Sequence, residues 1–582
     1  MSPDHARYRR FAVADVPDAP LTEQFRRARP DAGLTVLDFA RGPRRIRWRE
    51  LAELATDAAR VLRARGAAPG DRVCLLAPTS ADLLVTLAGV WRLGAVPVLM
   101  PRPRRADTDS FVAEIRRRVT AAAPALLVTT EEQAALLSGR IAAPAVSLDE
   151  LRRSTAGAGR PAPPVPSADA VALLQFTSGT TAASRAVPVT HAQLAGNIAA
   201  VGERAGVGPD DTMVSWLPLY HDMGVVTLGG MAAGGADVVL MATEDFLRQP
   251  ARWMGAVSEY RGTFTAAPDF AYGLAARVQA LRPAALDLSS LRVAANGAEA
   301  IDAEALSRTG KVLGDAGLPP HALCPMYGLA EATLGVTGSA GDEPVRVLGP
   351  GDGPAAPGAA EAGHPRPERR LVSCGPPLPG TEVRIEAAGT ADGLGLREDG
   401  LPEDAAGDGP VRVLPDGAVG EVMVRGPGVT PGYWTAGGGT DPGGTRGDGW
   451  LATGDLGFLD GGELFVCGRI KDMVIAGGRN LYPEDYELVA ESVPGVRAGN
   501  VIAFSVPGEE RMVVVAEGRD DDVAALGRRV LDTLREAVEH APHEVVVIAP
   551  DSLPKTSSGK RRRLAARARY ASGALDVLHT AR

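Results

Sequence analysis

Cysteine is scarce in this chain, which has four cysteines among 582 residues, all far apart in the sequence. Their spacing gives neither a metal-ligand pattern nor the density of a disulfide scaffold, so a reducing compartment fits best. The first residues, MSPDHARYRRFAVADVP, also lack the apolar stretch of a secretory signal. We therefore expect a cytoplasmic protein. The four cysteines are Cys74, Cys324, Cys374 and Cys467.

A surplus of positive charge is also missing. The 62 Lys and Arg residues face 71 Asp and Glu, which leaves a formal net charge of −9. A general nucleic-acid-binding protein needs a basic surface to displace counterions, so we expect no nucleic acid partner. Long apolar runs fail as membrane spans, because Arg92 breaks one and Asp237 with several glycines breaks the other, residues 225–242. The sequence predicts no membrane span.

Short apolar, β-rich runs instead alternate with helical patterns through the first half of the chain. Residues 72–78, RVCLLAP, indicate a buried strand, after which Thr79 or Ser80 can cap a helix that continues to about residue 93. The same theme returns in ALLVTT, VALLQF, TMVSWLP, ADVVLM, TFTAAP and LRVAANG. Such alternation favours an α/β class with layered α/β subdomains and largely parallel sheets.

The composition changes in the second half. Residues 338–370 and 387–410 are rich in Gly, Pro and Ala, and we expect flexible insertions there. The runs EVRIE and GEVMVRG indicate strands of a smaller β-rich subdomain. Beyond about residue 472 an α+β segment follows, with strands near NVIAFSV, RMVVVAEG and EVVVIAP and a helix near 521–540.

One stretch, LLQFTSGTTAASRAV at 173–187, passes abruptly from apolar to small and hydroxylic residues. Consecutive backbone N–H groups and hydroxyls in such a loop can bind an anion, and Gly179 allows close approach of the backbone. The Walker pattern G-x-x-x-x-G-K-[ST] is absent. Taken alone, the stretch indicates equally well a Ser/Thr turn after a buried strand. The candidate phosphate-binding residues are Thr177, Ser178, Gly179, Thr180 and Thr181.

Further motifs follow this loop in a fixed order. They are VSWLPLYHDMG (214–224), PMYGLAEATL (325–334), GWLATGDLGFL (449–459), GRIKDMVIAGGRNLYPEDYE (468–487) and LPKTSSGK (553–560). With them, nearly the whole chain resembles the acyl-adenylate-forming superfamily of acyl-CoA synthetases, nonribosomal adenylation domains and luciferases. The phrases APDFAY, NGAEA, YGLAEAT and LVSCG are closest to the fatty acyl-AMP ligase branch. This resemblance implies an N-terminal adenylate-forming domain (1–470) and a mobile C-terminal domain (471–582).

The resemblance also implies a nucleotide site that uses ATP and Mg²⁺. Glu331 would bind Mg²⁺, Asp455 in a tight TGDLG turn would accept hydrogen bonds from the ribose, and Arg469 would assist at the ribose or phosphate. Each has an ordinary alternative, namely a solvated Glu, an Asx turn and a surface ion pair. The adenine pocket would comprise Asn296, Gly297, Ala298, Glu299 and Tyr327, although Tyr327 could instead be core, and Met326 and Gly328 would also bind the nucleotide.

Lys560, Glu331 and His221 form the catalytic set that the resemblance implies. The Lys560 ammonium would bridge the attacking carboxylate and the α-phosphate, where negative charge accumulates. His221 would border the acyl pocket with Trp216, unless both simply pack in the core. Lys471 would be the hinge of the C-terminal domain, and Gly477 with Gly478 would enter the site after the domain swings.

The chain departs from the superfamily loop T-S-G-[ST]-T-G-x-P-K-G at Ala182, Ser184, Arg185 and Ala186. Arg185 keeps a cation but differs from Lys in geometry. A second cationic stretch, Arg561 to Arg563, follows Lys560. We expect it to be a solvated charge run, with contact to an acidic carrier protein as the alternative.

The resulting expectation is activation of a carboxylic, fatty acid to acyl-AMP with release of pyrophosphate. The acyl group would then pass to the phosphopantetheine thiol of an acyl carrier protein acting in trans, since no carrier-type sequence is apparent in this chain. An acyl-CoA synthetase using CoA is the first alternative. A standalone amino-acid adenylation enzyme is the second, although no FD-x-S-like clamp is evident. A non-catalytic nucleotide-binding homologue is the third.

Overall fold

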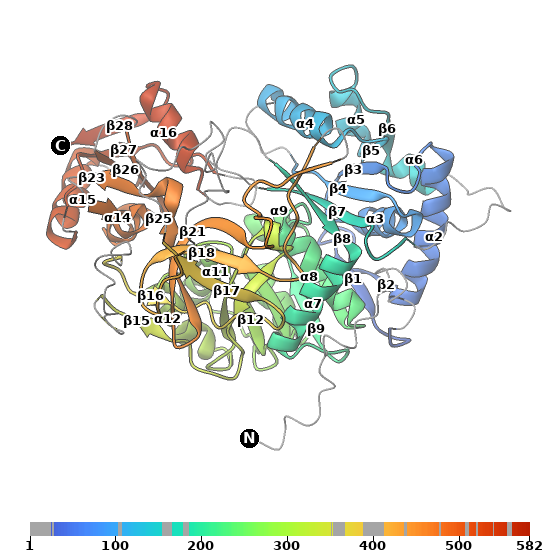
Figure 1. The fold of residues 1–582 in the computed structure, drawn as a ribbon, viewed down its shortest axis with the longest axis horizontal. Coiled ribbons are helices and arrows are strands. Elements are labelled where there is room, and N and C mark those ends of the chain that lie inside the picture. Colours follow the sequence, from blue (N-terminus) through green and yellow to red (C-terminus); the bar gives the residue numbers. More distant parts are fainter. Residues whose placement is uncertain are drawn as a thin grey trace.

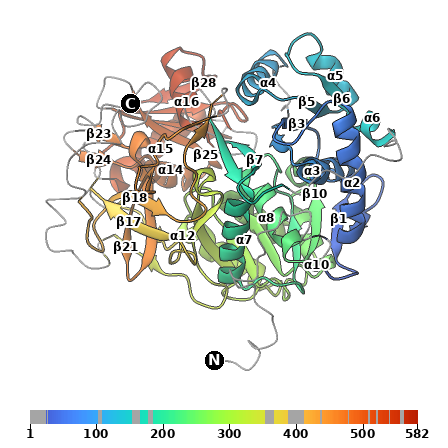
Figure 2. The same ribbon diagram turned by 45° about the vertical axis from the view of Figure 1, so that its right-hand side comes forward.

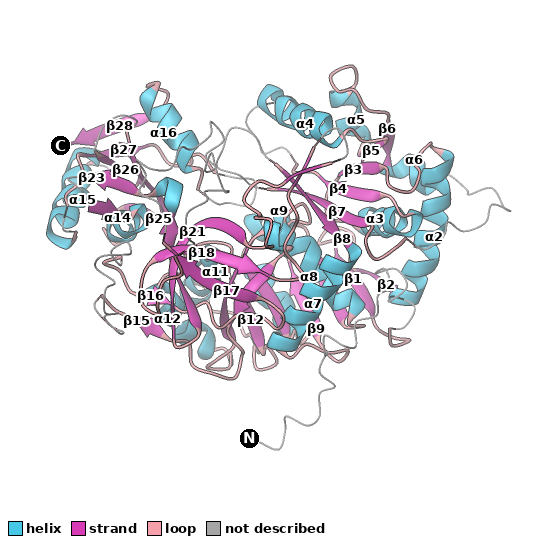
Figure 3. Cartoon of the chain, viewed as in Figure 1, coloured by secondary structure: helices cyan, strands magenta, loops and turns pink. Residues whose placement is uncertain are grey.

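A computed structural model gives the structure of the chain. It describes residues 25, 28–102, 108–153, 166–177, 185–350, 352, 367–387, 412–435, 439–476, 479–506, 511–519, 522–538, 540–555 and 561–582. Helices and strands are mixed along the sequence, as the colours of Figures 1 and 3 show. The α/β class predicted from the alternating pattern is confirmed.

The largest sheet has eight strands, of which the six inner ones run parallel. Antiparallel strands close both edges. Parallel strands are covered on both faces, which explains why the inner strands are nearly continuous apolar runs. In sheet order the strands are β14 (Gly335–Gly338), β13 (Leu323–Gly328), β12 (Val293–Asn296), β11 (Phe264–Ala267), β9 (Thr212–Ser215), β10 (Asp237–Met241), β1 (Gly33–Leu37) and β2 (Arg44–Arg47).

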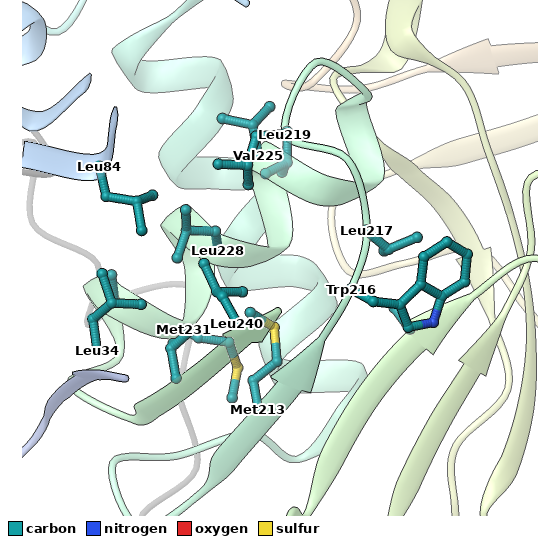
Figure 4. Close-up of a cluster of buried hydrophobic side chains, with 14 of the residues drawn as sticks. Leu34, Leu84, Met213, Trp216, Leu217, Leu219, Val225, Leu228, Met231 and Leu240 are labelled. Carbon is teal, nitrogen blue, oxygen red and sulfur yellow. The ribbon is translucent and has the colours of Figure 1, made fainter. Parts of the chain in front are cut away.

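Helices pack on this sheet and supply much of the core. They are α7 (His191–Ala205), α8 (Asp222–Ala233), α9 (Thr243–Arg248), α10 (Ala251–Glu259), α11 (Asp269–Leu281) and α12 (Ala303–Gly314). Figure 4 shows Leu228 and Met231 of α8 beside Met213 and Leu240 of the sheet. None of the described helices is both long and apolar enough to cross a membrane.

A second, wholly parallel sheet lies in the N-terminal part. Its order is β4 (Val96–Leu99), β3 (Arg72–Leu76), β5 (Leu126–Thr129) and β6 (Ala145–Ser147). The helix expected after β3 is α3 (Ala81–Leu93), which begins where the Ser80 hydroxyl accepts a hydrogen bond from Leu83 N. The other helices of this part are α2 (Trp48–Ala64), α4 (Thr108–Ala122), α5 (Glu131–Leu137) and α6 (Leu148–Arg153).

The run VALLQF departs from the expected parallel pairing. It forms β7 (Val171–Phe176), which pairs antiparallel with β8 (Ala186–Thr190). The connection covers only residues 177–185, whereas a parallel crossover needs a dozen or more residues. Of the candidate phosphate loop, the structure describes only Thr177 and Arg185, which flank residues 178–184.

The expected β-rich subdomain is an antiparallel sheet of β17 (Glu382–Glu386), β18 (Gly420–Arg425), β21 (Leu451–Asp460) and β22 (Glu463–Arg469). Two short antiparallel pairs accompany it, β15 (Val347–Leu348) with β16 (Leu371–Val372), and β19 (Tyr433–Trp434) with β20 (Thr440–Asp441).

The first part of 338–370, where we expect a flexible insertion, has described structure. β15 is paired in a sheet, and the Arg346 guanidinium forms an ion pair with Asp460. Charge pairing and strand pairing hold this segment, although its composition offers little to bury. Residues 351 and 353–366 lie outside the described part of the chain, as do residues 388–411.

The C-terminal elements form a separate sheet, in the order β25 (Val496–Ser505), β26 (Met512–Gly518), β27 (Glu544–Ile548) and β28 (Val577–Ala581). The helices α14 (Pro483–Glu491), α15 (Val523–Ala537) and α16 (Arg563–Ala571) cover it, and β23 (Val474–Ala476) pairs with β24 (Arg479–Leu481). The predicted strands and helix beyond residue 472 are confirmed. Figures 1 and 2 both show α7 and α8 between these elements and α2–α6.

Candidate active site

A cavity of about 490 Å³ lies between the large sheet, the β-rich sheet and the C-terminal elements. Its wall brings together many of the predicted site residues from segments far apart in the sequence. Those on the wall are Thr177, Arg185, His221, Gly297, Ala298, Glu299, Met326, Tyr327, Gly328, Glu331, Asp455, Arg469 and Lys471. Ser178, Gly179, Thr180, Thr181, Gly477, Gly478 and Lys560 lie outside the described residues.

Asp455 is the centre of a buried polar group in this wall. Its Oδ1 forms an ion pair with Arg469 Nε at 2.9 Å, and its Oδ2 accepts a hydrogen bond from the Tyr327 hydroxyl at 2.7 Å. Asp455 and Arg469 are cross-strand partners of β21 and β22, so the sheet register fixes the pair. The negative charge of Asp455 raises the pKa of Arg469 further. Each carboxylate oxygen accepts more than one hydrogen bond, so Asp455 can also accept from a ribose.

The tight turn expected around Asp455 is wrong. Asp455 lies in the middle of the ten-residue strand β21. The backbone of β21 is irregular at Gly454 instead, which has φ 72° and whose N–H donates to Glu421 at 2.9 Å. A glycine with positive φ and a nearby register shift bend the strand without ending it.

The predicted adenine segment follows β12 as a strained loop. Ala298 has φ 73°, a conformation that costs a non-glycine residue free energy. A Cβ on Gly297 would lie 2.7 Å from Met326 O, so the two segments of the cavity wall approach as closely as only glycine allows. Glu299 holds the loop, because its Oε1 accepts from Phe270 N at 2.7 Å. A flat ligand could pack between these backbones and the ring of Tyr327.

Asn296 lies behind this wall. It is fully buried, and its Nδ2 donates to Asp269 Oδ1 at 2.7 Å. Asp269 also accepts from Asp302 N at 3.4 Å. Burial raises the pKa of Asp269 from 3.8 to about 7. The pair therefore braces the loop from 297 to 301 from beneath, while its side chains do not reach the cavity.

Glu331 lies in a short 3-10 helix, Ala330–Ala332, and faces the cavity. Its Oε1 accepts from the Tyr433 hydroxyl at 2.7 Å, and its backbone oxygen accepts from Thr430 N at 2.8 Å. Thr333, just after it, has φ 69° and is anchored through its hydroxyl to Gly428 O at 2.7 Å. Mg²⁺ usually binds one or two carboxylates together with substrate phosphates. A fixed carboxylate on this wall fits that requirement.

The described ends of the candidate phosphate loop are tied together. Thr177 N donates to Arg185 O at 2.8 Å, which extends the β7–β8 pairing by one step. The Arg185 guanidinium carbon lies 3.9 Å from the ring centroid of Tyr433. The cation that ends the loop therefore reaches the same wall as Glu331.

His221 immediately precedes α8 and lines the cavity. Its Nδ1 lies 2.5 Å from Asp222 Oδ1, and Gln175 Nε2 donates to Tyr220 O at 2.8 Å, which fixes the preceding residue. When Nδ1 carries the proton donated to Asp222, Nε2 of the neutral ring is an acceptor. His221 Nε2 is buried and has no hydrogen-bond partner among the described residues.

Trp216 does not line the cavity, contrary to its assignment to the acyl pocket. Its ring stacks on Phe246 with centroids 3.8 Å apart and meets the edge of Trp253. Figure 4 shows it pointing away from the side chains around α8. An aromatic cluster on that face of the sheet buries it, so the simple packing alternative is correct.

A second, smaller cavity of about 30 Å³ adjoins the first. The two share the wall residues Val201, Thr227, Phe264 and Leu334. The remaining wall of the small cavity is apolar and comes largely from α7 and α8, at Ile198, Gly202, Val207, Val226, Gly230 and Met231. A cavity whose wall carries several charged side chains thus adjoins a small apolar one.

The solvated charge run expected at Arg561 to Arg563 is wrong for two of its members. Arg561 forms ion pairs with Glu491 at 3.0 Å and Glu487 at 3.3 Å. Arg563 is paired with Glu484 at 3.0 Å, Glu487 and Asp472. The three glutamates lie on α14, whereas Asp472 ends the short 3-10 helix Ile470–Asp472. All three arginines line the cavity, so the residues directly after Lys560 are at the site.

Lys471, the predicted hinge residue, also lies on the wall. Burial, followed by the neighbouring Arg469, lowers its pKa. Close to it, Arg369 pairs with Asp485 of α14 and donates to Cys467 O of β22. The buried ion pair of Arg369 with Asp485 thus connects the β-rich sheet to the C-terminal elements.

Three wall residues were not found from the sequence, namely Tyr433, Glu421 and Arg369. Tyr433 follows the turn sequence TPG and has no charge to attract notice. Glu421 reads as the polar position of an alternating strand. In the folded chain Glu421 accepts a hydrogen bond from Gly454 N, a contact that no local pattern predicts.

Comparisons with known proteins agree with this geometry. The family model of AMP-binding enzymes matches residues 23–434. The chain is 32% identical to the long-chain-fatty-acid–AMP ligase FadD26 of Mycobacterium marinum, with 96% of this chain and 97% of the relative covered. It is 37% identical to the medium-chain-fatty-acid–acyl-carrier-protein ligase JamA of Moorena producens, with 70% and 69% covered.

A solved structure from a study of fatty acyl-adenylate ligases of E. coli and L. pneumophila has a TM-score of 0.82 at 29% sequence identity. The match covers 96% of this chain and 99% of that one. The fold, the ordered motifs and the sequence relatives therefore all indicate the same family. The chain belongs to the family of AMP-binding enzymes and is an AMP-forming acyl ligase.

Proposed function

We propose that the protein joins a fatty acid to the AMP part of ATP and then transfers the acyl group to an acyl carrier protein. One observation carries the first half of this proposal. A cavity lined by Asp455, Glu331 and Arg185 continues into an apolar cavity between α7 and α8. A nucleotide would find charged partners in the larger cavity, and the small apolar cavity would receive the first methylenes of an aliphatic chain.

The nucleotide would bind across the polar cavity. Asp455 would accept hydrogen bonds from the ribose, the ring of Tyr327 and the backbone of the 297–301 loop would enclose the adenine, and Arg185 would face the phosphates. Glu331 would hold Mg²⁺, which neutralises phosphate charge when bound.

The acid would enter with its chain between α7 and α8 and its carboxylate near His221. Apolar burial of the chain supplies binding free energy of about 0.8 kcal/mol for each methylene. The carboxylate oxygen attacks the α-phosphorus, and the bond from that phosphorus to the bridging oxygen of pyrophosphate breaks. Positioning and charge neutralisation supply most of the rate in such reactions.

Lys560 would neutralise the charge that forms on the attacking carboxylate and the α-phosphate. Arg561, the next residue, lines the cavity, which supports this assignment. After adenylation the C-terminal elements, from residue 471 onward, would rotate about Lys471 and admit the thiol. The thiolate then attacks the acyl carbon and AMP leaves.

The carrier protein is favoured over CoA as the acceptor because JamA, a relative, is named as an acyl-carrier-protein ligase. The acceptor can be tested separately from adenylation. Isolated acyl-AMP is mixed with the enzyme and either CoA or a holo carrier protein, and the thioester is measured by mass spectrometry. Discharge by CoA alone would replace the carrier-protein step with an acyl-CoA synthetase reaction.

The adenylation step is tested with a panel of fatty acids and Mg·ATP, scoring acyl-AMP by mass spectrometry. Wild type should yield acyl-AMP and pyrophosphate. Lys560→Ala should lower the rate by about a hundredfold or more, as expected for loss of a transition-state charge partner, while ATP still binds. The exposed Lys311→Ala serves as the matched control. Normal acyl-AMP formation by Lys560→Ala would refute the role of this lysine, and no product from wild type with any acid would refute the function.

A further inference from the structure

Tyr433 lies between two opposite charges on the cavity wall. Its hydroxyl donates to Glu331 Oε1 at 2.7 Å, while the Arg185 guanidinium carbon lies 3.9 Å from its ring centroid. One side chain thus binds a carboxylate with its polar tip and a cation with its aromatic face.

The surroundings hold this ring in one place. Tyr433 is 8% exposed, and β19 pairs with β20 so that Tyr433 is opposite Asp441. A Cβ on Gly443 would lie only 2.4 Å from Tyr433 Cε2, so the ring packs directly on a glycine that has φ 56°. The same segment is tied to both neighbours, because Thr430 N donates to Glu331 O and the Thr430 hydroxyl donates to Pro188 O of β8.

A carboxylate and a guanidinium this close to one aromatic ring would otherwise be drawn into an ion pair with each other. No ion pair joins Arg185 and Glu331 in the described part of the chain. Direct pairing would cancel the negative charge needed for a cation and the positive charge needed for a phosphate. The ring of Tyr433 keeps the two charges apart, and both residues line the cavity.

We propose that Tyr433 is a positioning residue that separates Glu331 from Arg185 and aims the first at Mg²⁺ and the second at the phosphates of the nucleotide. The inference rests on the proposed function for the identity of these two ligands. It assigns distinct tasks to the two parts of one side chain, the hydroxyl for the metal-binding carboxylate and the ring for the phosphate-binding cation. The two tasks can therefore be removed one at a time.

The experiment compares Tyr433→Phe and Tyr433→Leu with wild type by calorimetric titration. ATP and pyrophosphate are titrated in EDTA and at a series of Mg²⁺ concentrations, with no acid present. Tyr433→Phe keeps the ring, so its affinity for pyrophosphate in EDTA should match that of wild type. Its half-saturating Mg²⁺ concentration should rise by about tenfold, the effect of losing one charge-assisted hydrogen bond. Tyr433→Leu should in addition bind pyrophosphate several-fold more weakly in EDTA.

Tyr570→Phe is the matched control, because the Tyr570 hydroxyl also donates to a buried carboxylate, that of Glu544 in β27. It should leave both titrations unchanged. The proposal would be overturned if Tyr433→Phe had the same half-saturating Mg²⁺ concentration as wild type. It would also be overturned if this variant bound pyrophosphate more weakly than wild type to the same extent with and without Mg²⁺. Tyr433→Phe is isosteric and decides the question even if Tyr433→Leu fails to fold. Since the titrations need no acid, a failure of adenylation in wild type would count against the proposed function and not against this result.

Discussion

At the scale of single residues, Asp269 shows how burial alone can change the charge of a carboxyl group. No described cation pairs with it, and its partners are the amide of Asn296 and the N–H of Asp302. Glu299 and Asp302 add negative charge nearby, so the neutral form is favoured up to a pKa of about 7. Asp269, which supports the loop from 297 to 301 from beneath, therefore changes charge near neutral pH.

This predicts a pH-dependent effect of Asp269→Asn on stability. Because the pKa is about 7 in the folded protein and 3.8 in the reference state, the folded protein holds the proton longer. Its free energy of unfolding therefore falls as pH rises from about 4 to about 7. Asparagine stays neutral at every pH, so the variant does not lose stability in this way. The free energy of unfolding of the variant minus that of wild type should therefore increase by about 2–3 kcal/mol between pH 5 and pH 8.

Urea unfolding of both proteins at pH 5 and pH 8 checks this prediction, with the exposed Asp315→Asn as control. The difference between variant and wild type should be larger at the higher pH. If the difference were the same at both pH values, Asp269 would be titrating near its ordinary pKa.

Site residues could be predicted where they belong to a recognisable motif, but their contacts with residues distant in the sequence could not. Glu331, Asp455 and Arg469 could be selected because they stand in recognisable phrases, and all three line one cavity. The partners of Arg561 and Arg563 could not be selected. Their carboxylates lie on α14 and at Asp472, about 70 to 90 residues earlier in the chain, and only the fold brings these segments beside them.

At the scale of elements, the spacing of α7 and α8 would determine the room for an acyl chain if the proposed function is right. Gly230 of α8 faces Ile198 of α7, and a Cβ on Gly230 would lie 3.4 Å from both Cγ1 and Cγ2 of Ile198. The cavity between these helices is only about 30 Å³. One added methyl group would therefore occupy much of the space.

Gly230→Ala should shift the substrate preference of the enzyme toward shorter acids. Displacing about one methylene from an apolar pocket changes kcat/KM by roughly tenfold or more, so the ratio of long-chain to short-chain rates should fall by about that factor. Gly255→Ala in α10 is the control, since a Cβ there meets nothing within 4 Å. Competition between two acids in one reaction measures the ratio, and an unchanged ratio would place the acyl chain elsewhere.

Element types followed from sequence patterns more reliably than their pairing did. The run VALLQF was recognisable as a strand, but its antiparallel partner depends on the short connection to β8. The TGDLG sequence looked like a turn because glycine and aspartate favour turns. In the structure, pairing of β21 on both sides with β18 and β22 overrides that local preference.

At the scale of the whole molecule, buried charges connect the body to the C-terminal elements. Asp485 of α14 pairs with Arg369, which also reaches Cys467 O, and Glu368 N donates to Asp485 Oδ2 at 3.1 Å. Both side chains of the pair are about nine-tenths buried. A rotation about Lys471 would have to break these contacts, so they hold the protein in the arrangement described here.

Asp485→Asn should therefore favour the second half-reaction. The neutral side chain still accepts hydrogen bonds but no longer balances the charge of Arg369. Removing one partner of a buried ion pair destabilises the arrangement that contains the pair by about 3–5 kcal/mol. The ratio of thioester formation to adenylation should rise several-fold. The exposed Asp149→Asn should leave the ratio unchanged, and a parallel loss of both activities would show that the pair only stabilises the fold.

The division into a body and a C-terminal unit was predicted from ordered motifs, not from composition. Composition did indicate the segments 338–370 and 387–410, yet it missed the pairing of β15 and the ion pair of Arg346. Small sets of hydrogen bonds and charges can hold a segment that has almost nothing to bury. Such contacts depend on partners distant in sequence, which no local pattern reveals.

The buried cysteines have a consequence for the chemistry beside them. Cys374 and Cys467 both contribute to the wall of the large cavity, and all four cysteines are free thiols. Burial raises the pKa of Cys374 to about 12, so almost none of it is thiolate, the nucleophilic form. A mixed anhydride made in that cavity would sit next to sulfur without acylating it. Cys374 would therefore not consume that intermediate, which under the proposed function is left for a thiol brought from outside.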